Sequence, residues 1–288
     1  MARPACLYCG AALPAEAVAE AAASAAALEA GPTPPDEGPP RMLVLVDSSS
    51  ADPGTLAAAR ELSAYEAALR HRRGGYSLEG VLGQAEAEPE AARLRAAGLG
   101  VFLVPESRAR AEPWLAIAGT RQDGGDLSLR GAGGSRQVSR PDLLLVVRGP
   151  IVREYQAPLA PRKVQTARLA DGYRFHLHLR SSPQVLELDP GDFDFGTRAT
   201  AFSSSLLEMN DWLAALVEGV VVDDAFRYST PALGPGTEPA GPLAATRALS
   251  RSAKGNDKSQ AAVHDNLRQF RFYSGWRGEV ERAKGAPS

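Results

Sequence analysis

Cysteine is scarce in this chain: its 288 residues include two, Cys6 and Cys9. A disulfide framework needs more cysteines at wider spacing, so we do not expect a disulfide-stabilised secreted domain. Long apolar runs are missing as well. The Ala-rich stretch 11–30 is interrupted by three glutamates, and no run approaches the length that crosses a bilayer. The sequence therefore predicts a cytoplasmic protein without a membrane span.

The chain also lacks an excess of charge of either sign, since its formal net charge is -2. No overall basic field favours nucleic acid as a partner. The charge is uneven, however. Residues 11–40 hold five acidic residues and no base, whereas residues 247–288 hold nine Lys and Arg against four Asp and Glu. Any attraction to nucleic acid is therefore expected at the C-terminal end.

Recognisable catalytic motifs are missing too. The serines at 203–205 do not form a nucleophile elbow, and the glycine-rich stretch 130–134 is not followed by a helix-opening pattern. His176 and His178 lie two apart on a predicted strand, but a further ligand at metal-site spacing is absent, so we interpret them as solvent-facing. These absences favour a protein without catalytic activity. An enzyme with an unrecognised site near His176, His178 and Asp192 is the alternative.

Two segments rich in proline and glycine divide the chain. Residues 31–40 contain five prolines in ten positions, which is typical of a stiff, extended linker. Residues 229–258 are rich in Pro, Gly, Ser and Ala, and we expect them to be disordered because they bury too little apolar surface. The remaining segments are an N-terminal piece, 1–30, a central body, and a C-terminal piece, 259–288.

The first half of the body, residues 41–108, predicts a small α/β module. Met42–Val46 is an apolar run suited to a buried strand, and Asp52 followed by Pro53 is a helix-start signal. Gly74 and Gly75 then end a helical stretch. The whole pattern reads strand, helix, helix, strand, helix, strand.

The second half of the body, residues 109–228, consists of short β-like runs followed by one amphipathic helix. In the run 173–180, Tyr, Phe and Leu alternate with Arg and His, which predicts one buried and one solvated face. The later helix carries an apolar stripe at helical spacing: Leu206, Met209, Leu213, Leu216 and Val220. We therefore predict an α+β protein, in which a βααβαβ module precedes a β-rich barrel or sandwich closed by a C-terminal amphipathic helix, with flexible linkers.

Cys6-Leu-Tyr-Cys9-Gly10 is similar to one knuckle of a zinc ribbon. A tight turn lets two thiolates face one ion, but a structural zinc site needs four ligands and the second cysteine pair is absent. Three interpretations stay open: a zinc site completed by other ligands, a degenerate ribbon that has lost its second half, and a redox pair.

Two segments are candidate partner-binding surfaces. Arg70, Arg72 and Arg73 precede Gly74, and they predict either a patch for an acidic partner or cations that interact with the carbonyls of a helix end. In the C-terminal piece, aromatic and basic side chains alternate at roughly helical spacing. Its candidate contact residues are Phe270, Tyr273, Trp276 and Arg277. They predict a tethered anchor for a protein or for nucleobases, with a terminal helix folded back on the body as the alternative.

Residues 43–106 resemble the C-terminal domain of the large-subunit ribosomal stalk protein and the related Clp-protease adaptor fold. The matching stretches are LSAYEAALRHRRGG and EPEAARLRAAGLGVFLV. Residues 110–222 resemble, more distantly, a pleckstrin-homology-like barrel. Its first loop, residues 121–126, is net acidic here, so phosphoinositide binding is not expected. The chain as a whole is similar to bacterial proteins that begin with a short zinc ribbon and continue into such modules.

Members of the stalk and adaptor families bind other proteins, so this resemblance implies a binding function. The sequence therefore predicts a non-enzymatic adaptor or regulatory scaffold that binds a protein partner. A nucleic-acid-associated protein that uses the basic, aromatic C-terminal piece is the main alternative.

Overall fold

A computed structural model describes residues 40–111, 113–123, 126–131, 134–160, 163–168, 172–195, 205–216, 219–229, 231 and 262–285. Arg41–Ser288 form one compact unit. Cys6, Cys9, the N-terminal piece and the linker 31–39 lie outside the described residues, and so does nearly all of the linker 229–258. The zinc, degenerate-ribbon and redox interpretations of Cys6 and Cys9 therefore stay predictions.

A three-stranded antiparallel sheet begins the described chain, with the strand order β2-β1-β3. Its elements are β1 (Arg41–Asp47), α2 (Pro53–Arg60), α3 (Ala64–Arg73), β2 (Tyr76–Gly83), α4 (Gln84–Ala96) and β3 (Gly100–Pro105). This is the element order that the sequence predicts for residues 41–108. The three helices cover one face of the sheet, where Val44 and Val46 pack against Leu56, Ala67 and Leu94.

Local capping residues set the helix ends of this small sheet. The Asp52 carboxylate accepts hydrogen bonds from the backbone N–H groups of Gly54 and Thr55 and so begins α2. Glu61 adopts a left-handed conformation and ends α2. Ser63 and Glu66 then form a capping box that begins α3. The stretch 53–73 is therefore two helices.

A seven-stranded mixed sheet follows α5 (Glu106–Ala111), with the order β12-β7-β10-β11-β4-β5-β6. Its strands are β4 (Trp114–Asp123), β5 (Asp126–Gly131), β6 (Gly134–Val138), β7 (Leu143–Ile151), β10 (Gly172–Leu179), β11 (Val185–Leu188) and β12 (Val221–Asp223). β6 and β12 lie at opposite edges and do not pair, so the described residues form an open sheet and the barrel alternative is wrong. The mixed α+β class and the C-terminal helix are confirmed.

Short elements connect these strands. A 3-10 turn, η1 (Arg140–Asp142), leads into β7, and η2 (Ala225–Tyr228) follows β12. Beside the large sheet, β8 (Arg153–Ala160) and β9 (Lys163–Arg168) form a hairpin, and β13 (Ala262–Asp265) pairs antiparallel with β8. The chain thus returns to the strand that follows β7 before it enters its last helix.

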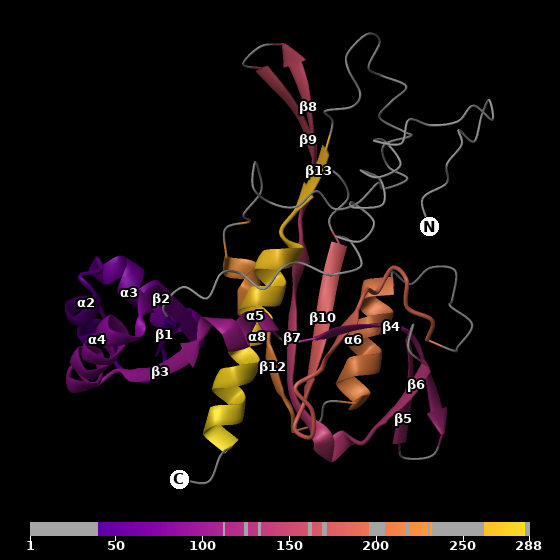
Figure 1. The fold of residues 1–288 in the computed structure, drawn as a ribbon, viewed down its shortest axis with the longest axis horizontal. Helices are drawn as coiled ribbons and strands as arrows, with labels where there is room; N and C mark the ends of the chain where they lie inside the picture. The colour runs from indigo at the N-terminus through magenta and orange to yellow at the C-terminus, as the bar shows by residue number, and fades with distance from the viewer. Residues whose placement is uncertain are drawn as a thin grey trace, which may run out of the picture. The chain divides into compact units, whose positions relative to one another are not determined.

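Both faces of the large sheet are buried (Figure 1). Phe175 and Leu177 of β10 pack with Met209 and Leu213 of α6 (Ser205–Leu216) on one face. The opposite face is covered by α8 (Leu267–Gly285), so the predicted solvated face of β10 is wrong: His176 and His178 are both 0% exposed. The alternating sequence of β10 therefore identified its two faces correctly. It did not reveal that α8 covers the face that carries the histidines.

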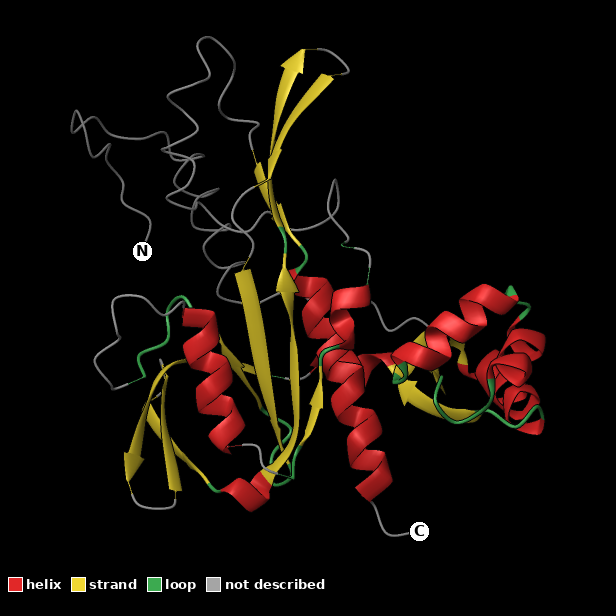
Figure 2. Ribbon diagram, turned by 180° about the vertical axis from the view of Figure 1, so that it is seen from behind, coloured by secondary structure: helices red, strands yellow, loops and turns green. Residues whose placement is uncertain are grey.

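Helix α8 lies between the two sheets (Figure 2). Phe270, Tyr273 and Trp276 belong to one apolar cluster, which also contains Leu43 of β1 and Leu145 of β7. The cluster crosses the predicted boundary at residue 108. The prediction of a freely tethered C-terminal anchor is wrong, because none of its candidate contact residues is more than 8% exposed: Phe270, Tyr273, Trp276 and Arg277. The alternative, a helix folded back on the body, is the arrangement observed.

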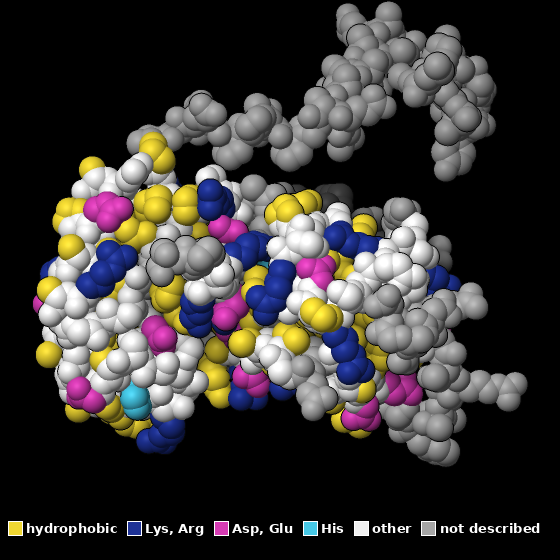
Figure 3. Space-filling view, turned by 90° about the horizontal axis from the view of Figure 1, so that it is seen from below, with side chains coloured by type: hydrophobic (Ala, Val, Ile, Leu, Met, Phe, Trp, Pro, Cys, Tyr) yellow, Lys and Arg dark blue, Asp and Glu magenta, His cyan; other side chains and the backbone are white. Residues whose placement is uncertain are grey.

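Charged side chains of both signs are interspersed over the face of the molecule drawn in Figure 3. Among the described residues, charged side chains also form short-range pairs along one helix, such as Glu90 with Arg93 and Glu106 with Arg110. Such exposed pairs each contribute only about 0–1 kcal/mol. On this face, the mixture of signs does not produce a field of a single sign.

We predict that Gly275→Ala destabilises the protein by about 1–3 kcal/mol, because a Cβ atom there overlaps the carbonyl group of Ala109 in α5. A Gly-to-Ala change inside a helix normally stabilises a protein by about 0.5–1 kcal/mol when no clash results. At Gly275 we expect the opposite effect, a loss of stability. Gly285→Ala, where no atom lies within 4 Å, is the control. Thermal unfolding checks both variants, and an unchanged or raised Tm for Gly275→Ala contradicts a close α5–α8 contact.

Candidate binding site

A layer of polar side chains lies between α8 and the large sheet, and we call it the buried polar layer. In its first part, His176 Nε2 lies 3.0 Å from Glu187 Oε2. Arg271 of α8 donates two hydrogen bonds of 2.8 Å to the same carboxylate. The His176 ring lies between Trp114 and Phe270, with centroid distances of 4.7 and 4.5 Å. This geometry fixes the N-terminal half of α8 on β10 and β11.

The second part of the layer fixes the middle of α8. His178 Nε2 lies 2.8 Å from Ser274 Oγ. Tyr273 donates a hydrogen bond of 2.8 Å to Asp223 of β12, and Arg277 donates to the other oxygen of that carboxylate. These hydrogen bonds join α8 to three strands of the large sheet. The pairing is incomplete, because Nδ1 of His176 and Nη1 of Arg277 are buried without a hydrogen-bond partner among the described residues.

The buried polar layer shifts the pKa values of its members. Burial lowers the pKa of His176 and holds that of His178 well below its ordinary range, so both rings are neutral at neutral pH. Burial by itself would raise the pKa of Glu187, but the hydrogen bonds from Arg271 and His176 hold that pKa far below its usual range. The layer thus combines neutral histidines with an ionised, doubly bound carboxylate.

The histidines of the buried polar layer are not accessible to a substrate. His176, His178 and Ser274 are all 0% exposed, and Asp192 lies on an exposed turn instead of joining them. Within the described residues no group of His, Cys, Asp or Glu is arranged to hold a metal ion. The alternative of an enzyme site near His176 and His178 therefore gains no support from the geometry.

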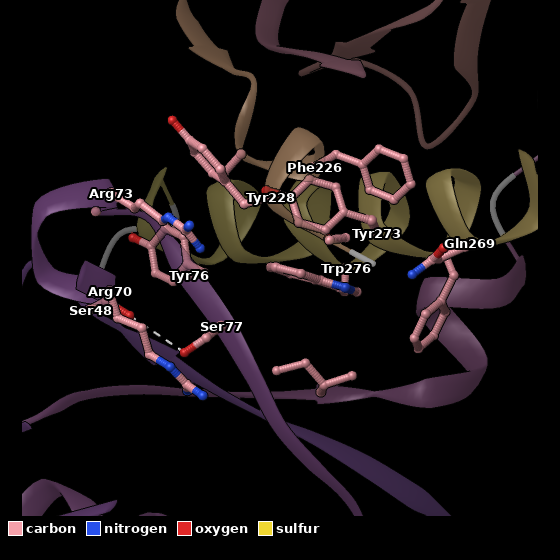
Figure 4. A pocket seen from close by; sticks show the side chains of 15 residues that line it. Ser48, Arg70, Arg73, Tyr76, Ser77, Phe226, Tyr228, Gln269, Tyr273 and Trp276 are labelled. Carbon is pink, nitrogen blue, oxygen red and sulfur yellow. Dashed lines mark hydrogen bonds between the residues drawn. The ribbon is translucent and has the colours of Figure 1, made fainter. Parts of the chain in front are cut away.

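A cavity of about 500 Å³ opens where the end of α3 and the start of β2 face η2 and α8 (Figure 4). We call it the arginine–aromatic cavity. Its lining includes two arginines and six aromatic residues: Arg70, Arg73, Tyr76, Phe226, Tyr228, Phe272, Tyr273 and Trp276. Polar groups from Ser48, Ser77 and Gln269 complete it. A cavity of this volume accommodates a drug-sized molecule or a few amino-acid side chains.

Two consecutive glycines give the cavity its arginine wall. Gly74 and Gly75 have φ angles of +64° and +73°, a region that other residues rarely adopt. They end α3 and reverse the chain into β2, so that Arg70 and Arg73 lie next to Tyr76. The turn also brings Gly75 close to η2, since a Cβ built on Gly75 would lie 4.0 Å from that of Ala225.

Two arginines line the cavity and no Asp or Glu does, although Glu79 and Asp223 accept hydrogen bonds from the lining residues Ser77 and Tyr273. The Arg73 guanidinium lies 4.5 Å from the centre of the Tyr228 ring. Arg70 forms no ion pair within 4 Å among the described residues. An anionic group would be bound favourably.

The structure brings together four of the seven predicted partner-binding residues. Arg70, Arg73, Tyr273 and Trp276 line the cavity, although the sequence placed them in two separate candidate surfaces. Arg72 is exposed and does not line it, and Phe270 and Arg277 are buried behind it. Sequence reasoning missed Tyr76, Phe226, Tyr228 and Phe272. The chain reversal at Gly74–Gly75 indicates that Tyr76 lies near the end of α3, but no local sequence signal indicates that η2 lies beside α3.

We predict that the free energy of unfolding falls as the pH drops below about 6.5, the ordinary histidine pKa. Below this pH the histidines are protonated in the unfolded chain but stay neutral in the folded buried polar layer. Protonation therefore stabilises the unfolded state, and the folded state becomes more stable again as the pH rises. His178→Asn should reduce the change in stability between pH 7 and pH 5, because it removes a buried ring whose pKa the fold holds well below its ordinary range. Denaturant titrations at both pH values check this, and an equal pH dependence in wild type and His178→Asn contradicts it.

No family model, curated protein or solved structure matches this chain. The stalk-protein, Clp-adaptor and pleckstrin-homology-like resemblances therefore stay predictions. Among the residues that the structure describes, no helix has the length and apolar character needed to span a membrane.

Proposed function

We propose that this protein is a non-enzymatic adaptor or regulatory scaffold, and that it binds a protein partner at the arginine–aromatic cavity. One observation carries the proposal: two arginines and six aromatic residues converge on one cavity that has no lining carboxylate. Arginine, tyrosine and tryptophan are the residue types that contribute most to binding at protein interfaces.

The ionisable groups of the cavity support binding more than catalysis. Apart from the two arginines they are tyrosines, and the lining contains no His, Cys, Asp or Glu that could act as a general base. Ser48 and Ser77 have their hydroxyl oxygens 3.5 Å apart, and Ser77 also donates to Glu79. Neither serine is paired with a histidine in the way that activates a nucleophile.

The nucleic-acid alternative has less support. It requires the C-terminal aromatics as an extended stacking platform on the surface, but Phe270 is fully buried, and Tyr273 and Trp276 are accessible only within the arginine–aromatic cavity. The basic side chains on the face in Figure 3 are mixed with acidic ones, so that face offers no extended track for a phosphate backbone. Zinc at Cys6 and Cys9 remains a separate proposal, which metal analysis of Cys6→Ser would test.

The proposal is tested by a photo-crosslinking amino acid at Tyr228, which lines the cavity, in the full chain expressed in its source cell. We expect a covalent adduct with a protein, and Arg70→Gln should reduce its yield by tenfold or more because an anion-binding group is lost. Arg72→Gln removes the same charge two residues away on the exposed side of α3 and should leave the yield unchanged.

A crosslinker at Tyr65, which is 75% exposed and does not line the cavity, is the positional control. Native mass spectrometry of the purified protein separates the alternatives. A retained small molecule or nucleic acid in place of a protein adduct contradicts the proposal, as does an adduct that is insensitive to Arg70→Gln.

A further inference from the structure

Strand β2 is an uncovered edge of the small sheet, and it begins inside the arginine–aromatic cavity. It pairs with β1 alone among the described strands, and none of its eight residues is buried. Tyr76, Ser77 and Leu78 line the cavity, and Leu78 is 37% exposed. An open edge strand offers unpaired backbone groups to an incoming extended segment.

The register of β1 and β2 identifies which backbone groups point outward. The backbone N–H of Ser48 donates a hydrogen bond of 2.9 Å to the carbonyl of Gly75. In an antiparallel pair, bonded and non-bonded positions alternate along the strand. Asp47 pairs with Tyr76 and Leu45 with Leu78, so both Tyr76 and Leu78 occupy non-bonded positions. Their N–H and C=O groups therefore face away from β1, toward a segment that would lie along the edge.

The start of this edge is closed by η2. The Arg73 guanidinium packs on the Tyr228 ring, and Ala225 lies against Gly75, so α3 and η2 meet across the beginning of β2. Figure 4 shows Arg73 and Tyr228 together on one side of Tyr76. A segment paired with β2 would therefore have to end here. A segment antiparallel to β2 ends with its carboxyl terminus beside the arginines, whereas a parallel one places its amino terminus there, where like charges repel.

Resting on the proposed function, we infer that the cavity binds the carboxyl-terminal end of a partner protein. The segment adds to β2 as an antiparallel fourth strand, its terminal carboxylate pairs with Arg70 and Arg73, and its last side chain packs on the aromatic lining. Backbone pairing supplies affinity that does not depend on sequence, and the aromatic lining selects an apolar final residue. An internal acidic segment is disfavoured as the occupant, because its chain would have to continue past the contact between α3 and η2.

The test uses the full chain and an array of acetylated hexapeptides that end in different apolar residues, each made as the free acid and as the carboxyl amide. We expect members of the array to bind as free acids and to bind at least tenfold more weakly as amides, because the amide lacks the charge that the arginines pair with. Arg70→Gln should remove this difference, and Arg72→Gln should retain it. Thermal unfolding confirms that each variant is folded.

Backbone pairing has its own readout. Hydrogen exchange at the amides of Tyr76 and Leu78 should slow when the best peptide saturates the protein, because these amides then donate to the added strand. Equal binding of acids and amides overturns the inference but leaves the proposed function standing. If no peptide binds but a crosslinker at Tyr228 captures a protein, the inference is likewise overturned and the proposed function stands. Failure of both the peptides and the crosslinker overturns the inference and the proposed function together.

Discussion

The architecture depends on helix α8, because this helix packs apolar side chains against both the small sheet and the large sheet. Its aromatic residues join β1 and β3 of the small sheet with β7 and η2 near the large one. A helix at the surface of a domain usually has one apolar stripe and one solvated face. Here the second face is also covered, which explains why Arg277, 2% exposed, needs Asp223 as a buried partner. Burying these charges contributes little net stability, but it sets the position of the helix along the sheet.

Because α8 fixes the small sheet against the large one, it also forms part of the arginine–aromatic cavity. The cavity combines the end of α3, the start of β2, η2 and the middle of α8, so its walls come from positions 48 to 276. Neither the small sheet nor the large one contains the cavity alone. The buried polar layer also supports the aromatic wall, since Tyr273 both lines the cavity and donates to Asp223.

The sequence was informative where the determining interaction is local. Asp52 with Pro53 and the Gly74–Gly75 pair act within a few residues, and the start of α2 and the end of α3 follow from them. It failed at β10, where alternating histidines are typical of a wet strand face. His178 pairs with Ser274, 96 positions further on, and His176 packs against Phe270 beside Glu187, whose carboxylate accepts hydrogen bonds from Arg271. No local pattern announces these contacts with the C-terminal helix. For the same reason the two halves of the cavity were recognised as separate basic or aromatic segments and not as one site.

The apolar cluster around α8 has a practical consequence for dissecting the molecule. Leu43 and Leu45 from the small sheet and Leu145 and Val147 from the large one share that cluster. A recombinant fragment that stops at residue 108, or that starts there, would leave one side of this contact in water. At about 25 cal/mol for each Å² of apolar surface, the resulting exposure favours self-association of the isolated pieces. Binding experiments with truncated fragments would therefore report association through newly exposed apolar surface, and not the binding properties of the intact protein.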